Sequence, residues 1–213
     1  MNRRVAAVVI AVIAVVLGLF GASAAVGQGA VDPLARDCEE SEHSLHTGFQ
    51  TPENACVETA FGDQSEQDKN PSLIITDAPR TRLVKQALTL QVSTRNLVRD
   101  RFLPAGQGGY YLESAQLDEN GLTRGHFHTA CRKIDRDEGA PEPLRQPIFK
   151  ATEDGGGGTE PDTVSVTFEQ GLPEPGKWQC VVWAGDGSHR TPMMAFANQI
   201  PAVDAVEITV KNR

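Results

Sequence analysis

The sequence predicts an all-β fold, a sandwich of about seven strands preceded by a loop-rich extension. Three observations support this prediction. From Ser72 onward, short segments alternate apolar and polar residues, which is the period of a half-buried strand. Turn-forming residues such as Asp118-Glu119-Asn120-Gly121 separate these segments. Four cysteines, an even number, indicate disulfides that stabilise a small domain.

Residues 1–25 have the pattern of a signal peptide. Arg3 and Arg4 precede an apolar run from Val5 to Phe20, and Ala22-Ser23-Ala24 supplies small residues for cleavage. We therefore expect a protein that is secreted or resides in the cell envelope. It would contact the membrane only if this leader stays uncleaved.

The charge of the chain argues against nucleic acid as a partner. Removing Arg3 and Arg4 with the leader changes the formal net charge from −8 to −10. Affinity for nucleic acid depends on clustered basic residues that neutralise phosphates. We expect instead a ligand in the extracellular space or the envelope, whose identity the composition leaves open.

Residues 26–71 predict an acidic, loop-rich extension without sustained helical or strand periodicity. Four cysteines allow three pairings in an exported protein. We favour Cys38 with Cys56 and Cys131 with Cys180, because each pair then stays within its own region of the chain. In the chain-entropy model such loops contribute roughly 3 and 4 kcal/mol to the free energy of unfolding.

Residues 72–213 predict the β-sandwich. Two expected strands flank an Asn-Gly dipeptide, which indicates a hairpin, and residues 135–162 are expected to form a loop. A buried disulfide beside Trp178 suggests an immunoglobulin-like architecture, although the tryptophans here flank Cys180 instead of lying between two cysteines. The expected strands are Leu73–Thr76, Lys85–Leu97, Tyr110–Leu117, Thr123–Ile134, Thr163–Phe168, Lys177–Ala184 and Ala205–Val210.

The segment Leu122–Ile134 carries the most informative pattern. In an extended strand His126 and His128 share one face, while Phe127 and Cys131 share the other. We expect the sulfur to face the interior and the imidazole rings to face outward. A His-x-His pair on one strand can present two nitrogens to a zinc or copper ion.

Two ligands do not complete a metal site, so a third must come from elsewhere. His189 is one candidate, and His43 and His46 are the others. Met193 and Met194 follow His189 and would suit copper in an oxidising compartment. Against a metal, Arg132 shares the histidine face and would repel a cation, and the two rings could instead hydrogen-bond across the sheet.

Three functions fit these residues. The sequence favours a non-enzymatic binding or structural module whose surface combines the histidine face with Asp186, His189 and Arg190. The first alternative is a secreted metal-dependent enzyme with His126, His128 and His189 as ligands and Asp186 or Glu113 as base. The second is a protein-interaction domain that docks through Trp183 and the pair Tyr110 and Tyr111.

Two further motifs are assigned to ordinary structure. Ser188 adjoins His189, but neighbouring residues point apart and no Gly-x-Ser-x-Gly elbow is present, so Gly185–Ser188 indicates a turn. Trp183 should lie opposite Trp178, and we expect the loop Gly185–Asp204 to cover it.

Overall fold

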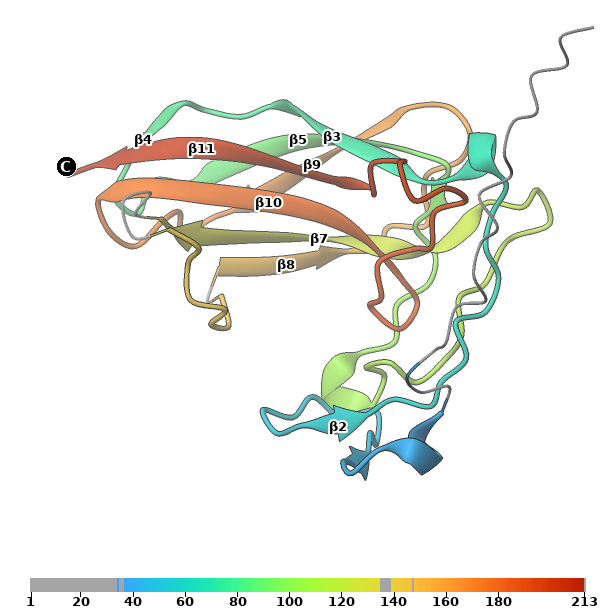
Figure 1. Cartoon of the computed structure of the whole chain (residues 1–213). Helices are drawn as coiled ribbons and strands as arrows, with labels where there is room; N and C mark the ends of the chain where they lie inside the picture. Colours follow the sequence, from blue (N-terminus) through green and yellow to red (C-terminus); the bar gives the residue numbers. More distant parts are fainter. Residues whose placement is uncertain (1–33, 35–36, 135–138, 147, 213) are drawn as a thin grey trace, which may run out of the picture. The chain divides into compact units, whose positions relative to one another are not determined.

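The computed structural model describes residues 34, 37–134, 139–146 and 148–212, and it confirms the predicted all-β sandwich (Figure 1). The predicted signal peptide and the first part of the extension lie outside the described residues. No helix in the described part of the chain reaches the length and apolarity that crossing a membrane requires.

The larger sheet has the strand order β4-β11-β10-β7-β6, and β8 also pairs with β7. The pairs β10–β11, β10–β7 and β7–β8 are antiparallel, whereas β4 and β6 add to the sheet in parallel. Its strands are β4 (Thr81–Leu83), β6 (Leu97–Val98), β7 (Thr123–Lys133), β8 (Ile148–Thr152), β10 (Gly176–Asp186) and β11 (Val203–Lys211).

The smaller sheet has the order β3-β5-β9 and is antiparallel throughout. It consists of β3 (Ser72–Asp77), β5 (Leu88–Arg95) and β9 (Asp162–Phe168). Ahead of it, β1 (Ser44–Leu45) and β2 (Ala55–Cys56) form a short parallel pair. Three short 3-10 turns complete the fold: η1 (Cys38–Glu40), η2 (Gln67–Lys69) and η3 (Ala105–Gln107).

The core lies between the two sheets. Strand β5 buries alternate residues, as the pattern of its sequence predicts. Each fully buried large apolar side chain contributes about 1.5–3 kcal/mol relative to exposure. The fully or nearly fully buried members of the core include Leu88, Leu90, Val92, Phe127, Cys131, Val166, Trp178, Cys180, Val182 and Ile208.

Both predicted disulfides are present, Cys38–Cys56 and Cys131–Cys180. Cys131 and Cys180 face each other in the register of β7 and β10, with their Cα atoms 4.0 Å apart. The bond therefore joins neighbouring strands of one sheet, whereas the disulfide of antibody domains joins the two sheets.

The predicted strand Tyr110–Leu117 is wrong. This segment forms turns, and it pairs only at the isolated bridges Gly62–Ala115 and Leu117–Thr123. The backbone N–H groups of Leu112 and Glu113 both donate to the Ser188 hydroxyl, at 3.0 and 2.8 Å. These tertiary hydrogen bonds replace a strand ladder, so the expected hairpin reduces to the turn that ends at Gly121.

The loop expected over residues 135–162 also contains a strand. Strand β8 pairs with β7 from Phe127–Thr152 to Cys131–Ile148, and the flanking prolines and glycines hide it in the sequence. It extends the sheet beside the two histidines of β7, and this placement brings Phe149 to the site.

Candidate metal centre

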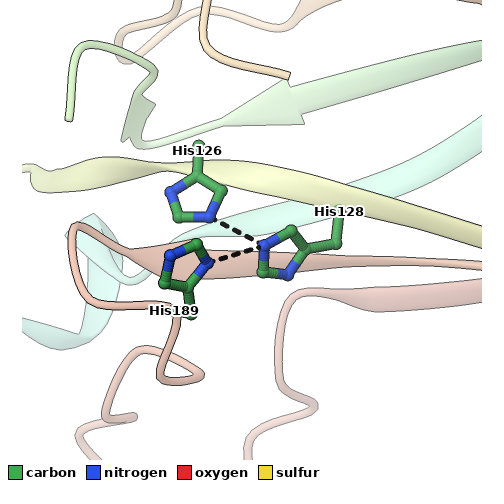
Figure 2. A group of neighbouring side chains, drawn as sticks. All are labelled: His126, His128 and His189. Carbon is green, nitrogen blue, oxygen red and sulfur yellow. Dashed lines mark hydrogen bonds between the residues drawn. The ribbon is translucent and has the colours of Figure 1, made fainter. Parts of the chain in front are cut away.

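Three imidazole rings meet at one end of the larger sheet (Figure 2). His126 and His128 lie on β7, and His189 lies in the turn that follows β10. Nε2 of His128 is 2.8 Å from Nε2 of His126 and 3.2 Å from Nδ1 of His189. Two nitrogens that bind one tetrahedral ion at about 2.0–2.1 Å are about 3.3 Å apart, so this spacing suits a metal ion.

Backbone carbonyls fix the protonation of two of the rings. Nδ1 of His126 lies 3.1 Å from the carbonyl oxygen of Arg101, and Nε2 of His189 lies 2.6 Å from that of Leu103. A carbonyl oxygen only accepts hydrogen bonds, so each of these nitrogens carries the proton. The lone pairs of His126 Nε2 and His189 Nδ1 therefore both face His128.

The hydrogen-bond donors and acceptors around His128 do not match. Its Nε2 faces two acceptor nitrogens but carries at most one proton, and its buried Nδ1 has no hydrogen-bond partner in the described part of the chain. A buried donor without a partner costs about 1–3 kcal/mol. A cation between the three nitrogens would satisfy all three lone pairs with Nε2 of His128 deprotonated. The proton of His128 would then lie on Nδ1, so the cost of that unpartnered atom would remain.

Burial keeps the two strand histidines neutral. His126 is fully buried and His128 is 4% exposed. Burial, with a smaller contribution from the neighbouring rings, lowers the pKa of His126 to about 4 and that of His128 to about 3. At neutral pH these imidazoles are thus in the form that binds metals.

The expectation that these rings face outward is wrong, although the side of the strand is correct. Phe127 and Cys131 enter the core, and the histidines leave the strand on the opposite face. Rings from the loop that carries Phe102 and Tyr110 and from the neighbouring strands β8 and β10 surround them there. The covering rings have centroids 4.9–5.7 Å from a histidine ring and belong to Phe102, Tyr110, Phe149 and Trp183.

Two glycines make room for the cluster where β7 and β10 pair. A Cβ atom on Gly185 would lie 3.2 Å from His126 Nε2 and 3.5 Å from His128 Cε1. A Cβ atom on Gly125 would lie 2.0 Å from the Gly185 carbonyl oxygen, which no neighbouring backbone can accommodate. Gly125 is therefore required for the strands to approach, whereas a Cβ atom at Gly185 would crowd the His126 ring and require it to shift by a few tenths of an ångström.

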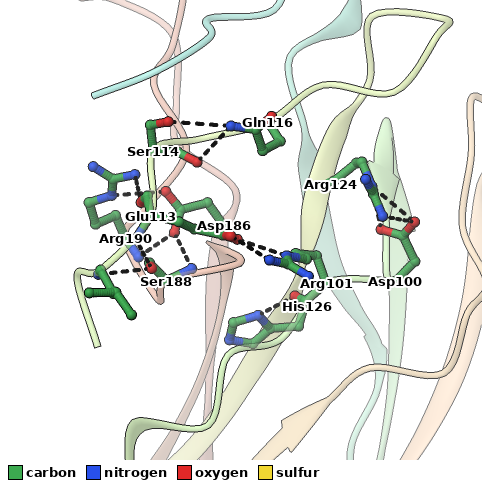
Figure 3. Close-up of polar contacts among 11 residues, drawn as sticks. Asp100, Arg101, Glu113, Ser114, Gln116, Arg124, His126, Asp186, Ser188 and Arg190 are labelled. Atoms are coloured by element: carbon green, nitrogen blue, oxygen red, sulfur yellow. Dashed lines mark hydrogen bonds and ion pairs between the residues drawn. The ribbon is translucent and has the colours of Figure 1, made fainter. Parts of the chain in front are cut away.

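A buried carboxylate shapes the turn that carries His189 (Figure 3). Oδ1 of Asp186 accepts from the backbone N–H groups of Ser188 and Arg190 at 2.9 and 3.0 Å, and Oδ2 pairs with Arg190 Nε at 2.9 Å. Burial raises the pKa of Asp186 against the opposing influence of Arg190. His189 itself has a φ of +72°, a left-handed conformation that this network holds.

In the structure Asp186, Ser188 and Arg190 hold the turn that carries His189. Arg190 also donates to the carbonyl oxygens of Ala60 and Glu113, and it thereby joins the turn to two other segments of the chain. Ser188 is fully buried, and its hydroxyl accepts the two backbone hydrogen bonds described above.

The second carboxylate considered as a base is also paired. Glu113 accepts from Arg101 Nε at 2.9 Å and from its Nη2 at 2.5 Å (Figure 3). Neither Glu113 nor Asp186 lines the cavity that borders the histidines.

That cavity has a volume of about 470 Å³. His128 and His189 form part of its wall together with three aromatic rings, and Arg145 lies at the same cavity. The remaining lining residues are Gln50, Phe102, Pro104, Ala105, Gly106, Tyr110, Gln146 and Phe149.

The other histidines and the methionines stay outside the cluster. His46 lies behind the stacked Tyr110 and Tyr111, 5.9 Å from each ring centroid, and its Nδ1 accepts from the Gly48 N–H. His43 is exposed. Met193 and Met194 are not among the residues that line the cavity.

Trp183 and Arg132 differ from what the sequence suggested. Trp183 is half-buried against His128, and the pocket beside it is lined by residues 142–144 and Gln146 instead of the expected loop Gly185–Asp204. Arg132 donates to Gln179 at 2.9 and 2.7 Å, so its charge is directed to the neighbouring strand and not to the cluster.

Several residues of the site were not expected from the sequence. Phe102 covers two of the histidine rings, and the carbonyls of Arg101 and Leu103 orient them. Carbonyl groups exist at every position, so no sequence signal identifies these two. Phe149 and Arg145 lie in a segment whose prolines indicated only a loop.

Comparison with protein families matches residues 79–211 to the CLU5d N-terminal domain. Comparison with curated proteins gives no match. Among solved structures, a β-glucosidase from Listeria innocua is 12% identical, with a TM-score of 0.37 over 84% of this chain and 20% of that one. A CARDB domain from Pyrococcus furiosus, solved with di-metal ions, is 12% identical, with a TM-score of 0.35 over 66% of this chain and 92% of that one. In the first of the β-glucosidase matches the chain spans 16% of the enzyme's length. Likeness at this level assigns no function.

Proposed function

The chain belongs to the family of the CLU5d N-terminal domain, and we propose that it is an exported β-sandwich module that binds a copper or zinc ion. The ligands would be His126 Nε2, His128 Nε2 and His189 Nδ1. The observation that supports this proposal is their convergence, with all three nitrogens within 4.8 Å of one another. Imidazole suits both metals, and copper should bind more tightly than zinc.

The surroundings of the ligands support the same proposal. Carbonyl groups that hold the second nitrogen of a ligand histidine are a regular feature of metal sites, and two of the three rings have one. The two disulfides are typical of proteins that fold outside the reducing cytoplasm, which supports the exported location in this proposal.

We propose binding in preference to catalysis because both candidate bases are engaged by arginines. Asp186 pairs with Arg190, and Glu113 pairs with Arg101. The aromatic residues considered as a docking surface contact the cluster or one another. Trp183 lies against His128, and Tyr110 stacks on Tyr111 with a centroid distance of 4.1 Å. We therefore assign Trp183 and Tyr110 to the walls of the site.

A titration of the chelator-treated mature protein with Cu²⁺ and Zn²⁺ tests the proposal. Calorimetry and elemental analysis after gel filtration should give one ion per chain. His126→Gln, His128→Gln and His189→Gln should each lose stoichiometric uptake while circular dichroism shows that the fold is retained. Each variant removes one of three ligands.

The matched control is His43→Gln, because His43 is an exposed histidine outside the cluster. Its uptake should equal that of the wild type. Stoichiometric uptake in all three cluster variants, or no uptake by the wild type, would refute the proposal.

A further inference from the structure

We propose that a small organic carboxylate enters the cavity beside His128 and His189 and completes the coordination of the metal ion, with Arg145 attracting it. This inference rests on the proposed function, because it concerns the same three-histidine site. It names the class of ligand that the site takes: an anion with a planar apolar body.

The charge of the site requires an anion. Three neutral imidazoles leave the two positive charges of a bound ion uncompensated, and His126 and His128 are almost entirely buried. An unpaired buried charge is costly. Two carboxylates of the neighbouring loops, Glu113 and Asp186, are already paired with arginines. No carboxylate of the described residues lines the cavity, so we infer that an anion from solution supplies the negative charge.

The cavity supplies the access. Three protein ligands leave a fourth position of a tetrahedral ion open. His128 and His189 form part of the cavity wall, so an ion that the three rings hold can be approached from the cavity. Its volume of about 470 Å³ lies within the range of small-molecule sites.

The lining selects the kind of anion. Arg145 is the only charged side chain among the described residues that line this cavity. It is exposed and makes no ion pair within the described ranges of the chain. The rings of Phe102, Tyr110 and Phe149 form apolar walls suited to a planar body. A guanidinium binds carboxylates well, and a carboxylate oxygen is also a ligand of zinc.

Azide and benzoate titrated into the Cu²⁺-loaded full chain at constant ionic strength provide the test. Azide is a small anion that needs only the open position, and it should produce a saturable charge-transfer absorption band. Benzoate should displace azide and bind more tightly than acetate, because its ring contacts the aromatic walls.

Arg145→Gln should raise the Kd for benzoate at least about threefold. Arg95→Gln is the matched control, because Arg95 is an exposed arginine on the smaller sheet. It should leave the Kd unchanged.

The outcomes separate this inference from the proposed function. Absence of metal uptake overturns both. Stoichiometric copper with a spectrum that neither azide nor benzoate changes overturns the inference alone. The assigned ligand class is overturned if benzoate binds no more tightly than acetate. It is also overturned if Arg145→Gln leaves the Kd for benzoate unchanged.

Discussion

Nδ1 of His189 lies 3.2 Å from Nε2 of His128, although 61 residues separate them in the chain. The antiparallel register of β7 and β10, which places Trp183 opposite His128, sets the end of β10 beside the histidine pair. The turn that follows then decides where the third ring points. Asp186 holds that turn from the inside, so the geometry of the cluster should depend on a residue that touches none of its nitrogens.

Asp186→Asn should therefore weaken metal binding. The substitution removes the charge that pairs with Arg190, and the turn that carries His189 should loosen. Outer residues that orient metal ligands typically contribute about 10–100-fold in affinity, and we expect a loss in this range. Competition with a chelator of known affinity measures it. Asp100→Asn, which breaks the partly exposed pair with Arg124, is the control, and equal affinities in the two variants would contradict the prediction.

The metal-free protein should lose stability in mild acid. In the unfolded chain a histidine has a pKa of about 6.5, whereas burial lowers the pKa of His126 to about 4 and that of His128 to about 3. Between these values the unfolded chain binds more protons, so the stability from these groups is full above pH ~6.5 and falls as the pH decreases toward the native pKa. From pH 7 to pH 5 each histidine should cost about 2 kcal/mol.

Urea unfolding in the presence of a chelator measures this effect. The His126→Gln, His128→Gln double variant serves as the reference, because other groups titrate equally in both proteins. The wild type should lose about 4 kcal/mol more than the variant between pH 7 and pH 5. If the free energies of unfolding of the two proteins change in parallel with pH, the histidines are not held neutral in the native state.

Arg99 should be the most sensitive charge in the sandwich. Its guanidinium is 1% exposed and pairs with Asp154 at 2.8 Å and with Asp162 at 2.5 Å. Replacing both aspartates by asparagine leaves a buried cation uncompensated. The free energy of unfolding should fall by roughly 2–3 kcal/mol, less than for a fully buried pair because the carboxylates are partly exposed.

The control for this prediction is again Asp100→Asn. Its pair with Arg124 is partly exposed on both sides, so its loss should change stability by less than about 1 kcal/mol. Chemical denaturation measures the free energy of unfolding of both variants. Equal losses would contradict the prediction that Arg99 is more sensitive than Arg124 to the removal of its acidic partners.

The two disulfides should contribute unequally. Cys131 and Cys180 are fully buried and close a loop of 49 residues, whereas Cys38 and Cys56 are 18 residues apart. Replacing Cys131 and Cys180 by alanine should lower the free energy of unfolding by about 4 kcal/mol, and the same change at Cys38 and Cys56 by no more than about 3 kcal/mol. Urea titration under non-reducing conditions compares them, and the opposite order would contradict the chain-entropy argument.

The long strands of the fold could be predicted because their signal is local. In β5 the residues Leu88, Leu90 and Val92 alternate with polar ones, and the period of two places them in the core whatever lies opposite. The same period separated His126 and His128 from Phe127. Where tertiary contacts compete, the local signal failed. Tyr110–Leu117 has the composition of a strand, but the N–H groups of Leu112 and Glu113 donate to the Ser188 hydroxyl.

The sequence by itself determined the all-β class and the face of β7 on which the histidines lie, because side-chain alternation and turn chemistry act over a few residues. It favoured one of three cysteine pairings, which the tertiary structure contains. Only the tertiary structure decided that these rings are buried, that His189 joins them instead of His43 or His46, and that two backbone carbonyls orient them. Those outcomes depend on which distant segments pack against the sheet. That packing is set by the balance of contacts across the whole domain, which no short stretch of sequence contains.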